Sequence, residues 1–365
     1  MTRSEALIIL NMVPEMGTIR LQKLLKYFDK PESILKASED KLMAVGGIGP
    51  QISAKIHSLK NEDLDKELVS VKKLGLKILT QDDKDYPENL KNIPDPPIVL
   101  YVKGELKQED RLAIGIVGSR RASFYGLTNA QNFASDLSDK GFTIVSGMAH
   151  GIDTYAHRGA LKAGGRTIAV MGSGFNHIYP EENKEFAEEI SKSGAAISEF
   201  PINTLPLKQN FPCRNRIISG LSLGVLIVEA ARNSGALITA DFALEQGREV
   251  FAIPGKVDSN NSFGTNGLIK QGAKLVTCVD DILEEFIMPK EKTRTESRVE
   301  ETLTQDKEED RVYNLISEQS IQLDELVEKT NLDIPRISGI LLRLQMKRLV
   351  QQLPGKQFVR NEDER

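Results

Sequence analysis

The sequence predicts an α/β protein with a Rossmann-like, mostly parallel sheet, helices on both faces of that sheet, and a small helical domain at each end of the chain. In residues 111–287, short β-branched runs alternate with helical segments, and this alternation forces right-handed crossovers between parallel strands. Before and after that stretch, apolar residues recur at helical spacing. We therefore expect four parts: residues 1–75, a sheet domain at 76–287, a flexible linker at 288–310 and a tail domain at 311–365.

The composition is that of an ordinary globular protein, with 40% apolar and 27% charged residues. The net charge of −4 carries little information, because local patches decide whether an acidic protein binds DNA. Cys213 and Cys278 lack ligand-like spacing, which argues against a disulfide framework or a metal site. Apolar runs are too short to span a membrane, and the opening residues lack a cleavage pattern, so we expect a cytoplasmic protein.

Residues 1–75 contain short amphipathic helices, such as LQKLLKYF and ESILKAS. The stretch KLMAVGGIGPQISAKIHSL predicts two helices joined by a tight glycine turn at 46–49, where a phosphate could approach backbone N–H groups. This pattern resembles a helix-hairpin-helix (a SAM-like small domain), which reads the duplex backbone without sequence preference. Only Lys55 and Lys60 supply positive charge, so a hairpin that serves packing alone is an equal alternative.

The sheet domain begins with an extended, proline-rich stretch at 76–110 that holds two expected strands, ILTQ and IVLYVKG. The expected strands that follow are LAIGIV, FTIVS, RTIAVM, AAIS, GVLIVEA, EVFAI and AKLV. In a doubly wound sheet of this kind, ligands bind at the carboxyl ends of the strands.

Three successive strands end in small, glycine-rich turns at that edge. The turns are Gly118-Ser119-Arg120, the stretch 146–153 with Gly147, and Gly172-Ser173-Gly174. Their backbone N–H groups, with helix N-termini behind them, can form an anion-binding concavity, and Arg120 can clamp a phosphate. No turn matches the dinucleotide fingerprint or the Walker pattern, which argues against NAD binding and against nucleotide triphosphate hydrolysis. We expect no cofactor.

The segment 201–219, PINTLPLKQNFPCRNRIIS, carries three cations, no acidic residue and one aromatic. Lys208, Arg214 and Arg216 are candidates for holding phosphates, and Phe211 is a candidate for stacking on a base. A solvated loop with a buried phenylalanine is the ordinary alternative. The position of the segment among the three glycine turns favours a single-strand nucleic-acid site.

His150, Asp153 and His157 raise the possibility of a metal or acid–base site, but no third ligand or paired carboxylate has suitable spacing. We expect Asp153 to cap a helix that begins near residue 154, with His157 one turn further on the same face. Glu229 ends a strand, and we expect it to bond the turn amides of the following Asn-Ser-Gly.

The linker at 288–310 is nearly all polar and lacks periodicity, so it cannot bury enough apolar surface to fold. The tail holds three expected helices, DRVYNLISEQ, LDELVEKT and IPRISGILLRLQMKRLV, followed by a short return, QQLPGKQFVR. It resembles a winged helix-turn-helix. Residues 334–360 contain six basic residues and no acidic one, which suits contact with phosphates, although such domains also serve as protein-docking modules.

Several long motifs resemble those of one family, the DNA-processing protein A family (DprA, also called Smf). They are GIVGSRRASFYG, VSGMAHGIDTYAHRGAL, TIAVMGSGFNHIYPEEN, LKQNFPCRNRIISGLS and VEAARNSGALITADFALEQGREVFAIPG. The resemblance spans about residues 76–287, and the two flanking domains also look like the modules of that family.

The resemblance implies a bacterial protein that binds single-stranded DNA, protects strands entering during natural transformation and loads the RecA recombinase onto them. It implies a pocket built from Arg120, Lys208, Phe211 and the backbone of the Gly172–Gly174 turn. Together with the glycine turns and the Arg-Asn-Arg run, the expected DNA-binding set is Gly118, Ser119, Arg120, Gly147, Gly172, Ser173, Gly174, Lys208, Phe211, Arg214 and Asn215. Members of the family dimerise through the late part of the sheet domain, where Leu268 and Ile269 are candidates.

Two rival functions remain at this point. Related Rossmann-like enzymes cleave nucleoside monophosphates into base and ribose phosphate, and they carry Pro-Gly-Gly-x-Gly-Thr followed by a catalytic glutamate. The matching place here reads EAARNSGA from Glu229 onward, which departs from that pattern. The other rival is an adaptor that docks a recombinase through the winged helix and does not bind DNA.

Overall fold

The computed structural model describes residues 1–286, 307–317, 320–330, 332, 334–346, 349–353 and 357–360. The chain folds as two compact units, residues 1–287 and residues 288–365. Of the expected linker, residues 288–306 lie outside the described residues, and residues 307–310 already belong to the first helix of the second unit. The flexibility of the linker therefore stays a prediction.

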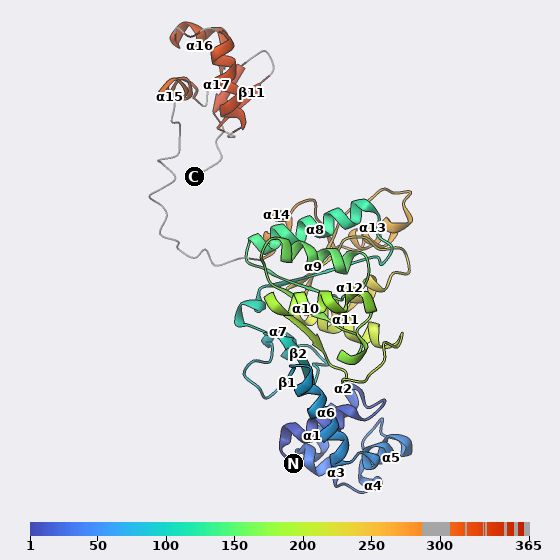
Figure 1. Cartoon of the computed structure of the whole chain (residues 1–365). Coiled ribbons are helices and arrows are strands. Elements are labelled where there is room, and N and C mark those ends of the chain that lie inside the picture. The colour runs from blue at the N-terminus through green and yellow to red at the C-terminus, as the bar shows by residue number, and fades with distance from the viewer. Residues whose placement is uncertain are drawn as a thin grey trace. The chain divides into compact units, whose positions relative to one another are not determined.

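The first 75 residues form a helical region of six helices (Figure 1). They are α1 (Arg3–Met12), α2 (Gly17–Phe28), α3 (Pro31–Leu35), α4 (Glu39–Met43), α5 (Pro50–Ser58) and α6 (Asn61–Lys73). Helix α1 begins at a capping box, in which the Thr2 side chain accepts from the Glu5 amide and the Glu5 carboxylate accepts from the Thr2 amide. The expected hairpin is confirmed as α4 and α5, joined by a turn in which Gly47 has a φ of +96°.

The sheet domain contains a nine-stranded sheet in the order β1-β2-β6-β5-β4-β3-β7-β8-β9. Strands β3 to β9 pair in parallel, and β2 and β1 continue the sheet antiparallel at one edge. The strands are β1 (Lys77–Thr80), β2 (Val99–Gly104), β3 (Ala113–Val117), β4 (Thr143–Ser146), β5 (Thr167–Val170), β6 (Ala195–Ser198), β7 (Gly224–Ile227), β8 (Glu249–Ala252) and β9 (Lys274–Leu275). All nine strands expected from the sequence are present. The chain reverses its direction across the sheet between β3 and β7, the place where folds of this class bind ligands.

Helices cover both faces of this sheet (Figure 1). Alternate residues of β3 point to opposite faces, so Ile116 packs with α8 and α9, whereas Val117 packs with α11 and α12. The helices are α7 (Glu88–Lys91), α8 (Phe124–Asp139), α9 (Ile152–Lys162), α10 (Lys184–Ser193), α11 (Asn210–Leu221), α12 (Gly235–Glu245), α13 (Phe263–Lys270) and α14 (Asp280–Leu283). Short 3-10 turns are η1 (Gln108–Arg111), η2 (Phe175–His177), η3 (Glu181–Asn183) and η4 (Asn260–Ser262).

The helical region shares a hydrophobic core with the sheet domain. Leu7 and Leu24 of the helices belong to the same buried cluster as Tyr101 of β2 and Met148 after β4. A polar tie adds to this contact, because the buried Glu67 carboxylate of α6 accepts from the Ile202 amide at 2.9 Å. The boundary expected near residue 75 therefore separates two kinds of structure inside one compact unit.

The second unit is a winged helix, as the sequence predicted. Its helices are α15 (Lys307–Leu315), α16 (Leu323–Thr330) and α17 (Ile334–Met346), and its strands are β10 (Ile321–Gln322), β11 (Val350–Leu353) and β12 (Gln357–Arg360). The strands pair in the order β10-β12-β11, so β11 and β12 form the wing. Val312, Leu326, Leu344 and Phe358 are part of its own buried core.

Candidate nucleic-acid interface

The turns after β3 and β4 pack closely against each other. A Cβ atom on Gly118 would lie 2.6 Å from Ile152 Cγ1, and one on Gly151 would lie 2.4 Å from the Ser119 carbonyl oxygen. Gly151 also has a φ of +77°, which side chains rarely adopt. The Ile152 amide donates to the Ser119 carbonyl at 3.3 Å, and the Ser119 amide donates to the Glu229 carbonyl at 2.8 Å. The glycines thus fix Arg120 at the carboxyl edge of the sheet.

Phe211, in the first turn of α11, lies beside Arg120 at this edge. Its ring is partly buried, and the exposed Arg120 guanidinium carbon lies 5.2 Å from the ring centroid. A Cβ atom on Gly172 would lie 2.8 Å from Phe211 Cδ1, so the backbone of the Gly172–Gly174 turn supports the ring directly. The structure therefore brings three sequence-predicted features together: the turn after β3, the turn after β5 and the aromatic of segment 201–219.

Arg214 lies below the ring rather than at the surface. Its side chain is 4% exposed, its guanidinium carbon lies 6.0 Å from the Phe211 centroid, and its Nη1 donates to the carbonyls of Gly147 and Val170. Burial lowers the pKa of Arg214 to about 10 and raises the pKa of the neighbouring Asp153 to about 6. Arg214 therefore ties the turns after β4 and β5 together beneath the site.

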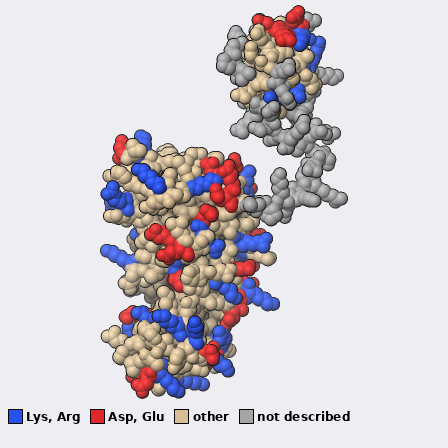
Figure 2. All heavy atoms as spheres, turned by 180° about the vertical axis from the view of Figure 1, so that it is seen from behind, with Lys and Arg blue, Asp and Glu red and all other residues tan. Residues whose placement is uncertain are grey.

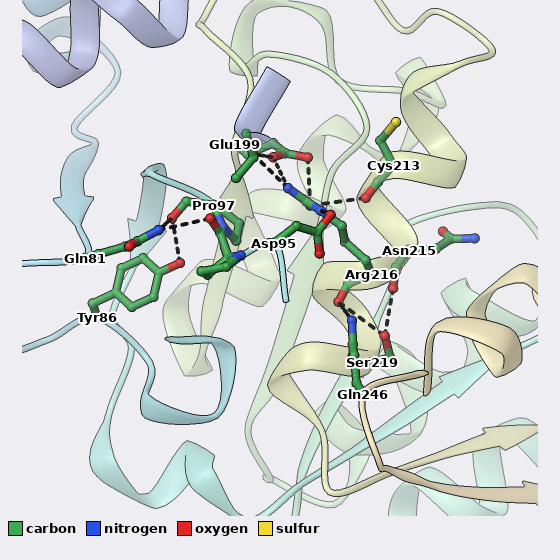
Figure 3. A network of polar contacts seen from close by, with 12 residues as sticks. Gln81, Tyr86, Asp95, Pro97, Glu199, Cys213, Asn215, Arg216, Ser219 and Gln246 are labelled. Atoms are coloured by element: carbon green, nitrogen blue, oxygen red, sulfur yellow. Dashed lines mark hydrogen bonds and ion pairs between the residues drawn. The ribbon is translucent and has the colours of Figure 1, made fainter. Parts of the chain in front are cut away.

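Arg216 points away from the site, so its interpretation as a phosphate contact is wrong. Two residues along a helix lie on nearly opposite faces, and Arg216 is accordingly buried between Asp95 and Glu199 (Figure 3). Its Nε donates to Asp95 at 2.7 Å, its Nη2 donates to Glu199 at 2.7 Å and its Nη2 also donates to Thr18 of α2 at 3.1 Å. Both carboxylates neutralise it, and it connects α11 to the helical region.

Of the other residues expected at the site or the dimer contact, Lys208 is exposed, whereas most of the rest bond or pack within the protein. Lys208 is exposed in the loop just before α11. The buried Ser173 donates its hydroxyl to the His177 carbonyl at 2.6 Å, and the Gly174 amide donates to the Thr204 carbonyl at 2.9 Å. The Asn215 side-chain amide donates to the Gly235 carbonyl at 3.2 Å and so joins α11 to α12. Leu268 of α13 is 7% exposed within the core, and Ile269 packs against that core.

Two side chains, Asp153 and Glu229, make contacts other than those expected. Gly151, not Asp153, is the N-cap of α9, and the Asp153 carboxylate accepts from the Ala149 amide at 3.4 Å inside that helix terminus. Glu229 accepts from the Ser123 amide at 2.8 Å and from the Ser123 hydroxyl at 2.5 Å, so it holds the start of α8 rather than the Asn-Ser-Gly turn. His157 is fully buried, with Nδ1 2.7 Å from Thr167 Oγ1. Among the described residues, no group of three metal-ligating side chains gathers.

Sequence reasoning missed a second aromatic at the site. Tyr179 lies between η2 and η3 and is 47% exposed. Its ring centroid is 5.7 Å from that of Phe211, with the two planes inclined by 55°. The available signal was its place in the motif GSGFNHIYP, seven residues after the turn at Gly172.

On the face drawn in Figure 2, basic and acidic side chains are interspersed. No helix among the described residues has both the length and the apolar character needed to cross a bilayer.

Comparisons with known proteins give a consistent result. The family model of DNA recombination-mediator protein A matches residues 77–287, and that of the DprA winged helix domain matches residues 296–356. Protein Smf of a Synechocystis species is 34% identical over 385 residues, covering 96% of this chain and 97% of its own. The X-ray structure of DprA from Streptococcus pneumoniae has a TM-score of 0.69 and 35% identity, covering 79% of this chain and 100% of that one. DprA from Helicobacter pylori, described for its single-stranded DNA binding mode, has a TM-score of 0.52 and 30% identity over 57% of this chain and 94% of its own.

Proposed function

Because this chain belongs to the DNA recombination-mediator protein A family, we propose that it binds single-stranded DNA at the carboxyl edge of its sheet. The observation that carries the proposal is the placement of the exposed Arg120 guanidinium 5.2 Å from the partly exposed Phe211 ring, on a support of glycine turns. A cation for phosphate beside an aromatic for a base is what an unpaired strand requires. The single-stranded DNA binding described for the H. pylori relative supports the same assignment.

In this proposal, Arg120 and Lys208 hold successive phosphates while Phe211 contacts a base. Every base has a π-face, so the site is indifferent to sequence, and each stack contributes about 1–3 kcal/mol. Arg214, buried under the ring and bound to two carbonyls, holds the turns in place and does not contact phosphate. Asn215 and Ser173 likewise act through the backbone that they bond.

The wider role that we propose is protection of strands that enter a bacterial cell during transformation, in the cytoplasm, and loading of RecA onto them. A homodimer would present two sites to one strand, which raises affinity through effective concentration. Ile269, partly exposed on α13, is the better candidate for that dimer contact, because Leu268 is already used by the core of its own chain.

The rival nucleotide hydrolase gains no support from the geometry. Glu229 is 4% exposed, and its carboxylate is bound to the Ser123 amide and hydroxyl. A carboxylate occupied in this way holds the N-terminus of α8 and is not positioned as a base for a sugar carbon. We therefore propose a binding protein without a catalytic residue, and release of free base from nucleotides would overturn this.

The proposal is tested by a salt series with single- and double-stranded oligonucleotides. Arg120→Ala should weaken single-strand binding. It should also make the plot of log affinity against log salt concentration less steep by about 0.7, the contribution of one phosphate contact to that slope. Phe211→Ala should weaken binding without changing that slope. The matched control is Arg158→Ala, since Arg158 of α9 is likewise an exposed arginine beside an aromatic ring, 5.2 Å from that of Tyr155.

A truncated chain ending at residue 287 completes the experiment, because residues 1–287 form a compact unit of their own. Retained preference for single strands in this truncation would support a site in the sheet domain. Loss of that preference, or equal effects of Arg120→Ala and Arg158→Ala, would contradict the proposal.

A further inference from the structure

The faces of the Phe211 ring are already engaged in this structure. Gly172 packs against the ring, and the guanidinium groups of Arg120 and Arg214 lie 5.2 Å and 6.0 Å from its centroid. A base that stacks there must compete with the favourable interaction between the Arg120 cation and the ring. Phe211, which is partly buried, therefore offers a base only part of its ring.

Tyr179 offers the adjoining aromatic surface. It is 47% exposed, so its ring is accessible to a ligand, and its centroid lies 5.7 Å from that of Phe211. The ring belongs to the loop that leaves the Gly172–Gly174 turn, so the same strand end that supports Phe211 also positions Tyr179. Tyr179 thus adds a second accessible ring next to Phe211, with its plane inclined to that of Phe211 by 55°.

The separation of the two rings decides how bases can bind. A base held between two rings needs about 3.5 Å on each side, or about 7 Å between the ring centroids. The observed 5.7 Å and the inclination of 55° do not leave that space. A base therefore does not fit between the two rings, and each ring can take a base only on a separate platform.

We propose that Tyr179 is a second base-stacking residue, so that each site takes two consecutive nucleobases of an unpaired strand. This inference rests on the proposed single-strand function and deepens it. The ligand is a dinucleotide step of any sequence, because stacking uses ring faces and no base edge. Tyr179 acts through its ring, and its hydroxyl is not required.

The test uses the full-length chain and oligothymidine of fixed length, with affinity measured at several salt concentrations. Tyr179→Ala and Tyr179→Leu should each weaken binding about fivefold to 150-fold, the range that one base–aromatic stack corresponds to. Neither should change the salt slope, because no phosphate contact is lost. Tyr179→Phe should bind within about twofold of the original chain, because it keeps the π-face.

The matched control is Tyr27→Ala. Tyr27 is 58% exposed on α2, and its ring lies 5.0 Å from that of Phe28, so it repeats the exposed aromatic pair away from the site. It should leave affinity unchanged. A 2-aminopurine probe placed in the strand should report two stacked positions in the original chain and one in Tyr179→Leu.

The outcomes separate this inference from the function on which it rests. If Phe211→Ala and Arg120→Ala weaken binding but Tyr179→Ala and Tyr179→Leu do not, the second platform is wrong and the proposed function stands. If Tyr179→Phe loses as much as Tyr179→Leu, the hydroxyl rather than the ring is responsible, and the stacking role is also wrong. If no variant at any of these three positions changes affinity, the proposed function itself fails.

Discussion

Gly172 sets the depth at which Phe211 lies, and this makes it the most sensitive small residue of the site. Its φ is outside the left-handed region, so alanine is compatible with the backbone, but the added Cβ would lie 2.8 Å from Phe211 Cδ1. The ring would have to move off the turn. Gly172→Ala should therefore weaken single-strand binding about tenfold, a loss within the range of one stack.

The control for Gly172→Ala is Gly235→Ala, because a Cβ atom there meets no other atom within 4 Å. Both variants are compared by oligonucleotide titration and thermal unfolding. Equal affinities for the two variants would show that the turn does not support the ring.

His157 is the residue whose burial makes stability depend on pH. Thr167 donates its hydroxyl to the Ile144 carbonyl at 2.7 Å and so accepts from His157 Nδ1, and burial lowers the pKa of His157 from 6.5 to about 3. Between pH 6.5 and pH 3 the unfolded chain holds a proton that the folded chain lacks, so stability falls as the pH falls through this window. Asp153 acts in the opposite sense, because its raised pKa, about 6 against 3.8, lets the folded chain hold the extra proton.

His157→Asn should remove the first of these effects and leave the second. Below pH 6.5, the free energy of unfolding of the original chain should fall more steeply than that of the variant. The difference is up to about 1.4 kcal/mol for each pH unit. Urea denaturation at several pH values between 4.5 and 7.5 measures this difference. Parallel pH profiles for the two proteins would mean that His157 takes up a proton in the folded state.

At the scale of elements, helix α11 carries two different tasks on opposite faces. Arg214 lies beneath the candidate site. Arg216, in contrast, lies between Glu199 and Asp95 (Figure 3). It is 5% exposed and donates to Thr18 of α2. Removing a buried ion-pair partner leaves carboxylates unpaired, so Arg216→Met should lower the free energy of unfolding by about 3–5 kcal/mol.

The comparison for Arg216→Met is Arg3→Met, which breaks the exposed pair of Arg3 and Asp82. That variant should lose at most about 1 kcal/mol, since exposed pairs contribute little. Urea denaturation of both variants gives the two values. A loss for Arg216→Met no larger than that for Arg3→Met would show that the network does not hold α11 to the helical region.

The elements of the sheet could be predicted because parallel strands are buried on both sides and stand out as β-branched runs, as in β3, β4 and β7. What could not be predicted is the direction of side chains that meet residues far away in the chain. No local sequence pattern around Arg216 indicates that it will pair with Glu199 and Asp95. Likewise, no pattern around Glu229 indicates that it will bind Ser123, 106 residues earlier. Tyr179 was missed for the same reason, since only folding brings it beside Phe211.

At the scale of the whole molecule, the sheet domain and the helical region of the first unit share one hydrophobic core. Tyr101, Met148 and Ile202 of the sheet domain are buried in one cluster with Leu7, Leu24 and Ile56 of the helices. A recombinant fragment starting near residue 76 would therefore present an open apolar surface to solvent, and its Ile202 amide would lose the Glu67 acceptor. Such a piece should self-associate, so the shortest soluble version of the first unit has to begin at α1.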